Sequence, residues 1–251
     1  MLKHWFKLTF NKVFFCVLLL LLALNFFSTF INDDLLMNSS IALFIPVFLI
    51  FFFLKNNYMG FAFVSFLIFS FLGDISYYFF PEDSVLKTSS ILYILSYTQL
   101  LIIVLPRFKI FKVDKLIAIY LLVVFAINLY FLYTIYEILK IIIPDQNEVL
   151  LIGVKSLTLI ILAFISFAVY LNTQTKQSIL FLVATICFAF SAIINYVNYY
   201  YLYDWSFVML NRATYILGLY LLFKYFIIEN KMRKPKEVKA GETFSSDNVL
   251  A

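Results

Sequence analysis

The sequence predicts an all-α polytopic membrane protein with about eight transmembrane helices. Three observations predict this class: of the 251 residues, 64% are hydrophobic, 21% are aromatic and only 13% are charged. A soluble domain has to cover its surface with polar groups, and 19 basic and 14 acidic residues, most of them in short connections, are too few to do so. We therefore expect most of the apolar surface to face lipid.

Eight apolar segments are long enough to cross a bilayer, which takes about 20 residues of helix. They cover residues 12–31, 36–54, 61–80, 89–105, 116–136, 149–171, 178–201 and 205–228. The first segment follows three lysines, but no small-residue cleavage site comes after it, so we interpret it as a retained helix rather than a signal peptide. The second contains Pro46, which a membrane helix tolerates when neighbouring helices satisfy the freed carbonyl.

The basic residues gather on one side of these segments. Most of them precede the first segment, occupy alternate connections or follow the last segment, whereas Lys87 and Lys140 lie in the opposite, acidic connections. Because positive charge favours the cytoplasmic side, we expect both termini in the cytoplasm and the chain in a bacterial inner membrane.

After residue 228 the chain loses its apolar content and becomes first basic and then polar. This composition predicts a disordered basic cytoplasmic tail over residues 229–251, attracted to anionic headgroups, after a transmembrane domain over residues 1–228.

Several classes of function lack the residues they need. His4 is the single histidine, and Cys16 and Cys187 both lie inside apolar runs, so we expect no metal site, disulfide framework or imidazole catalysis. No glycine-rich phosphate loop is present, and no exposed basic helix outside the tail. We therefore expect no cofactor and no nucleic-acid partner.

A weak internal similarity relates the two halves of the chain. Residues 69–75 align with residues 187–193, and residues 93–96 align with residues 215–218 at nearly the same offset. Because the matched segments are four helices apart, they run in the same direction, which indicates a possible parallel four-plus-four repeat.

Four ionisable residues lie inside the expected helices: Asp74, Glu137, Lys155 and Arg212. In hydrocarbon each costs at least about 2.5 to 3.5 kcal/mol unless it reaches water or a partner. Counted from the outer helix ends at about 1.5 Å per residue, all four lie at a depth of roughly 9 to 10 Å, and Asn195 lies near that level. We expect the two acids and two bases to neutralise one another in a polar chamber that opens toward the outer leaflet.

Simpler interpretations exist for most of these residues. The long stems of Lys155 and Arg212 can carry their charges to the interface, and Glu137 can stand among the headgroups. The side chain of Asp74 is too short to reach water, which leaves protonation, pairing or a wet cavity. We interpret the tyrosines among residues 196–203 as an interfacial belt rather than a ligand cage.

Asp74 belongs to a short sequence run that resembles a known motif. Residues Ser70 to Asp74 resemble the Ser-Leu-Leu-Gly-Asp signature of the YhhN-like membrane proteins, the lysoplasmalogenase family. Thr214 and Tyr215 resemble the Thr-Tyr segment in the last helix of that family. The resemblance implies eight helices and hydrolysis of the vinyl ether bond of lysoplasmalogens, which releases a fatty aldehyde.

This chain departs from the family pattern at three places. The second Ser-Asp signature of the family falls on Ser191 and Ala192, so the second aspartate is missing. The glutamine that follows the Thr-Tyr segment falls on Leu219, and the fourth segment has no histidine. Asn195, one turn after Ala192, is polar but cannot serve as an acid.

A vinyl ether is cleaved when a proton reaches the carbon distal to the ether oxygen and water captures the oxocarbenium ion. On the family resemblance we expect Asp74 to act as the acid and Glu137 as the base. We expect four residues to bind a lysophospholipid-like substrate drawn from the membrane lipids: Lys155, Asn195, Arg212 and Tyr215.

Two alternatives stay open. A non-catalytic relative would bind a lipid in the same chamber, and Ala192 favours that alternative. A small-molecule transporter is favoured by the parallel repeat and the intramembrane charges, but Gly73, Gly153 and Gly218 stand singly, without the prolines that usually break transport helices. The oligomeric state and the physiological substrate are not specified by the sequence.

Overall fold

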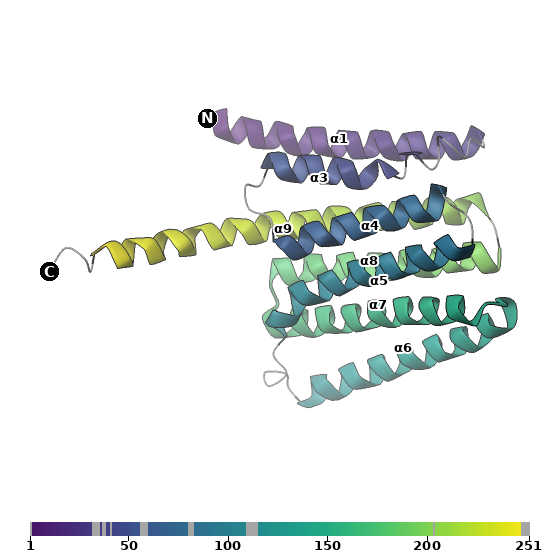
Figure 1. Cartoon of the computed structure of the whole chain (residues 1–251). Coiled ribbons are helices and arrows are strands. Elements are labelled where there is room, and N and C mark those ends of the chain that lie inside the picture. Colours follow the sequence, from purple (N-terminus) through teal and green to yellow (C-terminus); the bar gives the residue numbers. More distant parts are fainter. Residues whose placement is uncertain are drawn as a thin grey trace.

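The computed structural model describes residues 2–31, 36, 39–40, 42–55, 60–79, 83–108, 115–202 and 204–246. Over these residues the protein is all-α, as expected, and forms eight α-helices (Figure 1). They are α1 (Leu2–Ile31), α3 (Phe44–Lys55), α4 (Phe61–Phe79), α5 (Asp83–Val104), α6 (Lys115–Ile142), α7 (Gln146–Thr173), α8 (Lys176–Tyr200) and α9 (Trp205–Ser246). A short 3-10 turn, η1 (Leu105–Arg107), follows α5.

Each expected segment overlaps one of these helices, but the bounds differ. Among the described residues, five helices are long and apolar enough to cross a membrane: α5, α6, α7, α8 and the part of α9 up to Glu229. The described residues of α1 and α4 contain shorter apolar stretches, Val13–Ser28 and Phe61–Ser76. The fold is that of an all-α membrane protein, and a set of eight crossings stays a prediction.

The second segment is shorter than expected because its helix begins late. α3 has 12 residues and starts at Phe44, so Pro46 lies in its first turn rather than in its middle. The first N–H groups of a helix have no partner within that helix, so a proline is tolerated there. Helical hydrogen bonds run from Leu43 to Ser39 and from Val47 to Leu43, so the carbonyl freed by Pro46 lies between them, and its satisfaction by a neighbouring helix stays a prediction.

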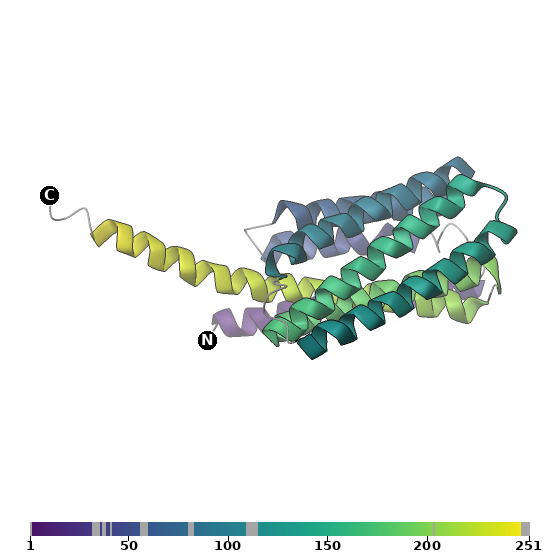
Figure 2. The same ribbon diagram turned by 90° about the horizontal axis from the view of Figure 1, so that it is seen from below.

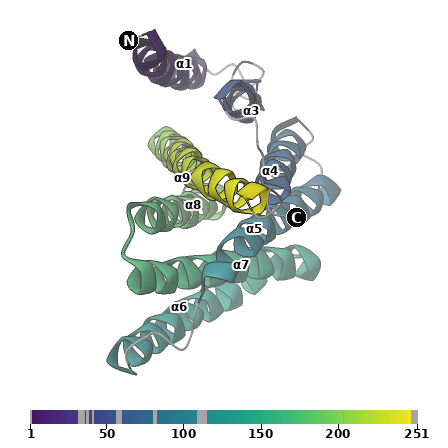
Figure 3. The ribbon, with the colours of Figure 1, turned by 90° about the vertical axis from the view of Figure 1, so that its left-hand side faces the viewer.

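The helices alternate in direction across the bundle. α1 lies at one edge, α6 lies at the opposite edge, and α4, α5, α8 and α9 lie between them (Figures 1 and 3). The C-terminal ends of α4, α6 and α8 and the N-terminal ends of α5, α7 and α9 share one end of the bundle, which we call the far end. α1 begins at the other end, where α9 also emerges. Both termini thus lie at one end, which is the arrangement expected when both are on the same side of a membrane.

α9 extends well beyond the other helices (Figure 2). Its backbone is helical to Ser246, whereas the sequence analysis predicts a disordered tail from residue 229. Lysine, arginine and glutamate are good helix formers, and a helix propagates more easily than it nucleates, so α9 continues into the polar stretch. At the end of the apolar part of α9, the carboxylate of Glu229 pairs with the guanidinium of Arg107 at 2.5 Å. Residues 247–251 lie outside the described residues.

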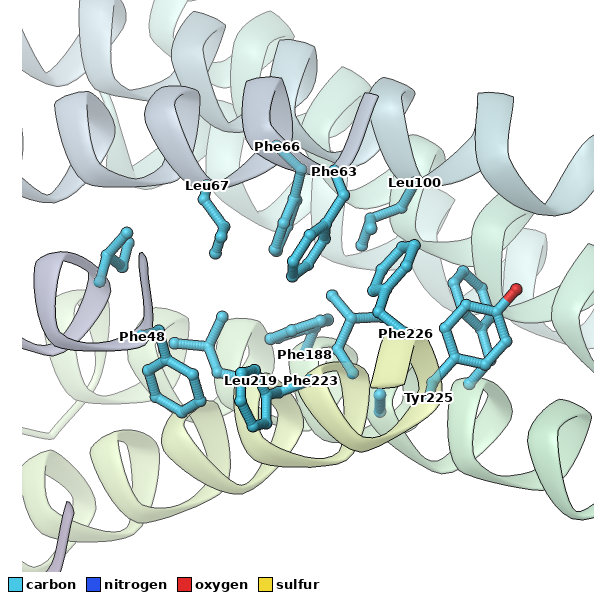
Figure 4. Packing of buried hydrophobic residues seen from close by; sticks show 14 of the residues in the cluster. Phe48, Phe63, Phe66, Leu67, Leu100, Phe188, Leu219, Phe223, Tyr225 and Phe226 are labelled. Carbon is cyan, nitrogen blue, oxygen red and sulfur yellow. The ribbon is translucent and has the colours of Figure 1, made fainter. Parts of the chain in front are cut away.

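An aromatic core joins α4 to α8 and α9 (Figure 4). The rings of Phe63 and Phe226 lie 3.9 Å apart between centroids, and Phe66 faces Phe188 at 6.0 Å. Gly218 allows α9 to approach α8, because a Cβ at this position would lie 2.8 Å from the ring of Phe188. Helices in lipid associate through close packing of this kind rather than through the hydrophobic effect.

The alignment that indicates a repeat matches two helix contacts. It places Ser70 opposite Phe188 and Ser96 opposite Gly218. In the first half the hydroxyls of Ser70 and Ser96 form a hydrogen bond of 2.6 Å between α4 and α5. In the second half Phe188 packs on Gly218 between α8 and α9. The duplication itself stays a prediction.

Candidate functional site

A cavity of about 450 Å³ is lined by residues from α3 to α9. Its volume is within the range of sites that bind small molecules or cofactors, which is roughly 300 to 1,000 Å³. Five of the six residues that the sequence analysis selects for the site line this cavity: Asp74, Lys155, Asn195, Arg212 and Tyr215.

The lining changes from polar to apolar along the bundle. On α7, Glu148 and Lys155 line the cavity near the far end, and Leu159, Phe164 and Phe167 line it deeper in the bundle. From Glu148 to Phe167 this face covers about 28 Å, at about 1.5 Å per residue.

The antiparallel helix α8 shows the same order. Leu182 and Ile186 line the deep part of the cavity, and Asn195 and Tyr196 line the part near the far end. The faces of α7 and α8 that line the cavity are therefore amphipathic along their length.

Asp74 lies near the C-terminal end of α4 and is only 4% exposed. Its Oδ1 accepts a hydrogen bond from the hydroxyl of Tyr93 on α5. Nearby, the hydroxyl of Ser89 donates to the carbonyl of Gly73 at 2.9 Å, so the first half of α5 supplies hydrogen-bond donors to the end of α4. A carboxyl with so little exposed surface needs hydrogen-bond partners of this kind.

Lys155 reaches the same tyrosine from α7. Its Nζ lies 5.7 Å from the centroid of the Tyr93 ring, a distance at which an ammonium is attracted to an aromatic face. Among the described residues no ion pair joins Asp74 to Lys155 or to Arg212. The direct neutralisation that the sequence analysis expects is therefore replaced here by a carboxyl and an ammonium that share Tyr93.

Arg212 connects the cavity to the N-terminal helix. Its side chain is buried, and Nη1 donates to Oδ1 of Asn25 on α1 at 2.5 Å. The amide of Asn25 in turn donates to the hydroxyl of Ser40 at 2.6 Å. Arg212 thus has a structural contact in addition to its position in the cavity wall.

Asn195 belongs to a polar chain between α8 and α9. Ser191 donates to Oδ1 of Asn211 at 2.5 Å, and Nδ2 of Asn211 donates to Oδ1 of Asn195 at 3.3 Å. Tyr215 follows on α9, with its ring 5.6 Å from that of Phe188. These contacts place amide and phenol groups in the cavity wall without adding charge.

Glu137 is not part of this site. It does not line the cavity, its side chain is 45% exposed, and its carboxylate pairs with Lys140 of the same helix at 3.0 Å. The expectation that Glu137 lies in the chamber rests on its depth in the membrane alone, and depth does not specify which face of α6 a residue occupies. The structure brings Glu148 to the cavity instead.

Glu148 was missed because α7 begins earlier than expected. Asp145 caps this helix by accepting from the N–H of Asn147 at 2.9 Å, so Glu148 lies in the first turn rather than in a connection. Asp145 also pairs with Lys87, and this ion pair, with the backbone N–H group, holds the pKa of Asp145 below its usual value of 3.8. An acidic cap followed by an acidic first turn is the sequence signal for this helix start.

The tyrosines near the end of α8 are also placed differently from the expectation of a simple belt. Tyr196, Tyr199 and Tyr200 all line the cavity. The hydroxyl of Tyr200 donates to Oε1 of Glu148 at 2.8 Å.

Fold and site together define the class of this protein: an all-α bundle of apolar helices around an amphipathic cavity. Comparison of the chain with protein-family models, with curated proteins and with solved structures finds no match. The likeness to the YhhN-like family therefore rests on the short runs around Asp74 and Tyr215 and stays a prediction.

Proposed function

We propose that this integral membrane protein binds single-chain lipids in its cavity and cleaves the vinyl ether bond of lysoplasmalogen-like lipids. One observation carries the proposal: a single cavity combines a polar part, which contains the buried carboxyl of Asp74, with an apolar part deep in the bundle. A single-chain lipid has the same two parts.

The charges near the far end suit the headgroup of such a lipid. The ammonium of Lys155 and the guanidinium of Arg212 both line the cavity and are groups that bind phosphate. Deeper in the bundle, Leu159, Phe164 and Phe167 offer apolar surface for the hydrocarbon chain. This arrangement supports a lipid whose polar end lies beside Asp74.

Asp74 can supply both proton transfers of vinyl ether hydrolysis. Its carboxyl gives a proton to the carbon distal to the ether oxygen, which leaves an oxocarbenium ion and a carboxylate. Water adds to the cationic carbon and returns a proton to Asp74, and the resulting hemiacetal breaks down to a fatty aldehyde and the alcohol of the headgroup. Because the proton is returned, one carboxyl completes the cycle. The cycle therefore does not require Glu137 or an acid at Ala192.

The test is release of aldehyde by the purified protein. Wild-type protein in maltoside micelles is incubated with a lysoplasmalogen, and free aldehyde is measured over time. We expect turnover by wild-type protein, a loss of at least about 100-fold in Asp74→Asn, and unchanged turnover in Glu137→Gln, which removes a charge outside the cavity. Equal turnover in wild-type protein and Asp74→Asn would remove Asp74 from the reaction.

The second candidate is a lipid-binding protein without catalysis. The observation that favours it is Ala192, which lines the cavity where the family pattern has its second aspartate. This candidate predicts tight binding of single-chain lipids and no aldehyde above the level of empty micelles.

We also propose that all eight helices cross the bacterial inner membrane with both termini in the cytoplasm. The position of both chain ends at one end of the bundle and the basic connections at that end support this topology. Reporter fusions after residue 251 test it: a reporter that is active only in the cytoplasm should be active, and activity of a periplasmic reporter would overturn the topology.

A further inference from the structure

We infer that the part of the cavity near the far end contains a subsite for a cationic amine headgroup, formed by Glu148 with Tyr196, Tyr199 and Tyr200. The inference rests on the proposal that a lipid occupies the cavity, but it does not depend on hydrolysis. Its ligand class is the zwitterionic phospholipid with one hydrocarbon chain and an ammonium or quaternary ammonium group.

The carboxylate of Glu148 is the first element of this subsite. Its Oε1 accepts from the hydroxyl of Tyr200 at 2.8 Å, a neutral donor that orients the carboxylate without cancelling its charge. In the part of the chain that the structure describes, no lysine or arginine pairs with Glu148. The cavity wall therefore has a negative charge for which an ammonium is the natural complement.

The tyrosine rings form the second element. The ring centroids of Tyr199 and Tyr200 lie 4.8 Å apart at an angle of 75°, and those of Tyr196 and Tyr200 lie 5.3 Å apart at 45°. These rings meet at angles rather than in a flat stack, so the tyrosines that line this part of the cavity present ring faces and edges of different orientation. Aromatic faces attract cations, and aromatic corners are a common way to bind quaternary ammonium groups.

The order of groups along α7 matches the order of groups in a zwitterionic lipid. Glu148 lies in the first turn, Lys155 lies about two turns further along the helix, and the apolar run from Leu159 to Phe167 follows. An amine, a phosphate and a hydrocarbon chain occur in that order in such a lipid. A phosphate lipid without an amine would give the carboxylate of Glu148 no cationic partner and would bring the negative phosphate close to that carboxylate.

A competition between two lipids tests the subsite. Purified protein in maltoside micelles receives equal amounts of lysophosphatidylcholine and lysophosphatidic acid with the same chain, and native mass spectrometry measures the ratio of the two bound lipids. We expect wild-type protein to favour the choline lipid. Glu148→Gln should lower the ratio about tenfold, and Tyr196→Leu or Tyr199→Leu should lower it roughly 2- to 5-fold each.

Two matched variants control for charge and for loss of a ring. Glu137→Gln removes the same charge outside the cavity, and Tyr130→Leu removes an exposed tyrosine on α6. Both should keep the wild-type ratio.

A wild-type preference for the phosphate lipid, or a ratio unchanged in the Glu148 and tyrosine variants, would overturn the inference. A choline preference without release of aldehyde would support the subsite and remove the hydrolysis. Release of aldehyde without a headgroup preference would support the hydrolysis and remove the subsite.

Discussion

The contact between Tyr93 and Asp74 gives the sharpest prediction about the stability of the site. Tyr93→Phe removes the hydroxyl that donates to the carboxyl of Asp74 and keeps the ring that faces Lys155. The change therefore removes the hydroxyl without removing the ring. Because Asp74 is only 4% exposed, water cannot easily replace the lost donor.

The expected cost follows from the burial of the acceptor. A buried polar group left without its partner costs about 1 to 3 kcal/mol. We therefore expect Tyr93→Phe to lower the free energy of unfolding by about 1 to 3 kcal/mol. Tyr130→Phe removes a hydroxyl from a tyrosine that is 68% exposed and should change the free energy of unfolding by less than about 0.5 kcal/mol.

A double-mutant cycle with Asp74→Ala tests the reasoning. Unfolding free energies are measured by titration of maltoside micelles with a denaturing detergent for the wild-type protein, both single variants and the double variant. In the Asp74→Ala background the hydroxyl has lost its acceptor, so Tyr93→Phe should cost much less, and the coupling free energy should be about 1 to 3 kcal/mol. Equal cost of Tyr93→Phe in both backgrounds would refute the assignment of Tyr93 as the donor that satisfies Asp74.

Three further predictions concern packing, anchoring and pH. Gly218→Ala should destabilise the bundle by about 1 to 3 kcal/mol because its Cβ would meet the ring of Phe188 on α8. Gly60→Ala is the control, since a Cβ there has open space around it and should show no clash penalty. Thermal unfolding of the two variants compares these effects, and equal destabilisation would contradict the packing of Gly218 on Phe188. Asn25→Leu removes an acceptor of the buried guanidinium of Arg212 and should cost about 1.5 to 3 kcal/mol, an expectation that fails if the unfolding midpoint is unchanged. The pKa of Asp145 is lowered in the folded protein, so its pairing with Lys87 stabilises the fold above pH 3.8 and is lost as the pH falls below that value. Asp145→Asn should flatten the acid side of a plot of melting temperature against pH, and a curve identical to that of the wild-type protein would contradict this.

The sequence predicts the helices well and their faces less well. Length and hydropathy locate the eight helices of the described residues, and five of these are long and apolar enough to cross a membrane, which takes about 20 residues. The start of α3 was misplaced because Pro46 is compatible with two positions, the middle of a long helix or the first turn of a short one.

The candidate site shows the same division. Asp74, Lys155 and Arg212 were found because charge is rare in apolar helices, and the structure places all three in one cavity. The depth of Glu137 in the expected membrane makes it a candidate for the site. The face of α6 on which it lies depends on how the helices pack, and hydropathy does not report that packing. Glu148 was missed because a carboxylate close to a helix end looks like part of a solvated connection.

The tyrosines near the end of α8 show a further limit. In sequence, an interfacial belt and a binding corner have the same composition, since both need aromatic rings with a polar edge. Only the placement of Tyr196 and Tyr200 in the cavity wall separates the two.

Photo-crosslinking tests most directly whether a single-chain lipid occupies the cavity. A lysophospholipid with a diazirine near the end of its chain is irradiated with the purified protein, and the modified residues are identified by mass spectrometry. If the lipid occupies the cavity, adducts form on the deep lining, at Leu159, Phe164 or Phe167 of α7, and an excess of unlabelled lipid prevents them. Adducts confined to the outward faces, such as Tyr130 and Tyr133 of α6, would contradict this occupancy.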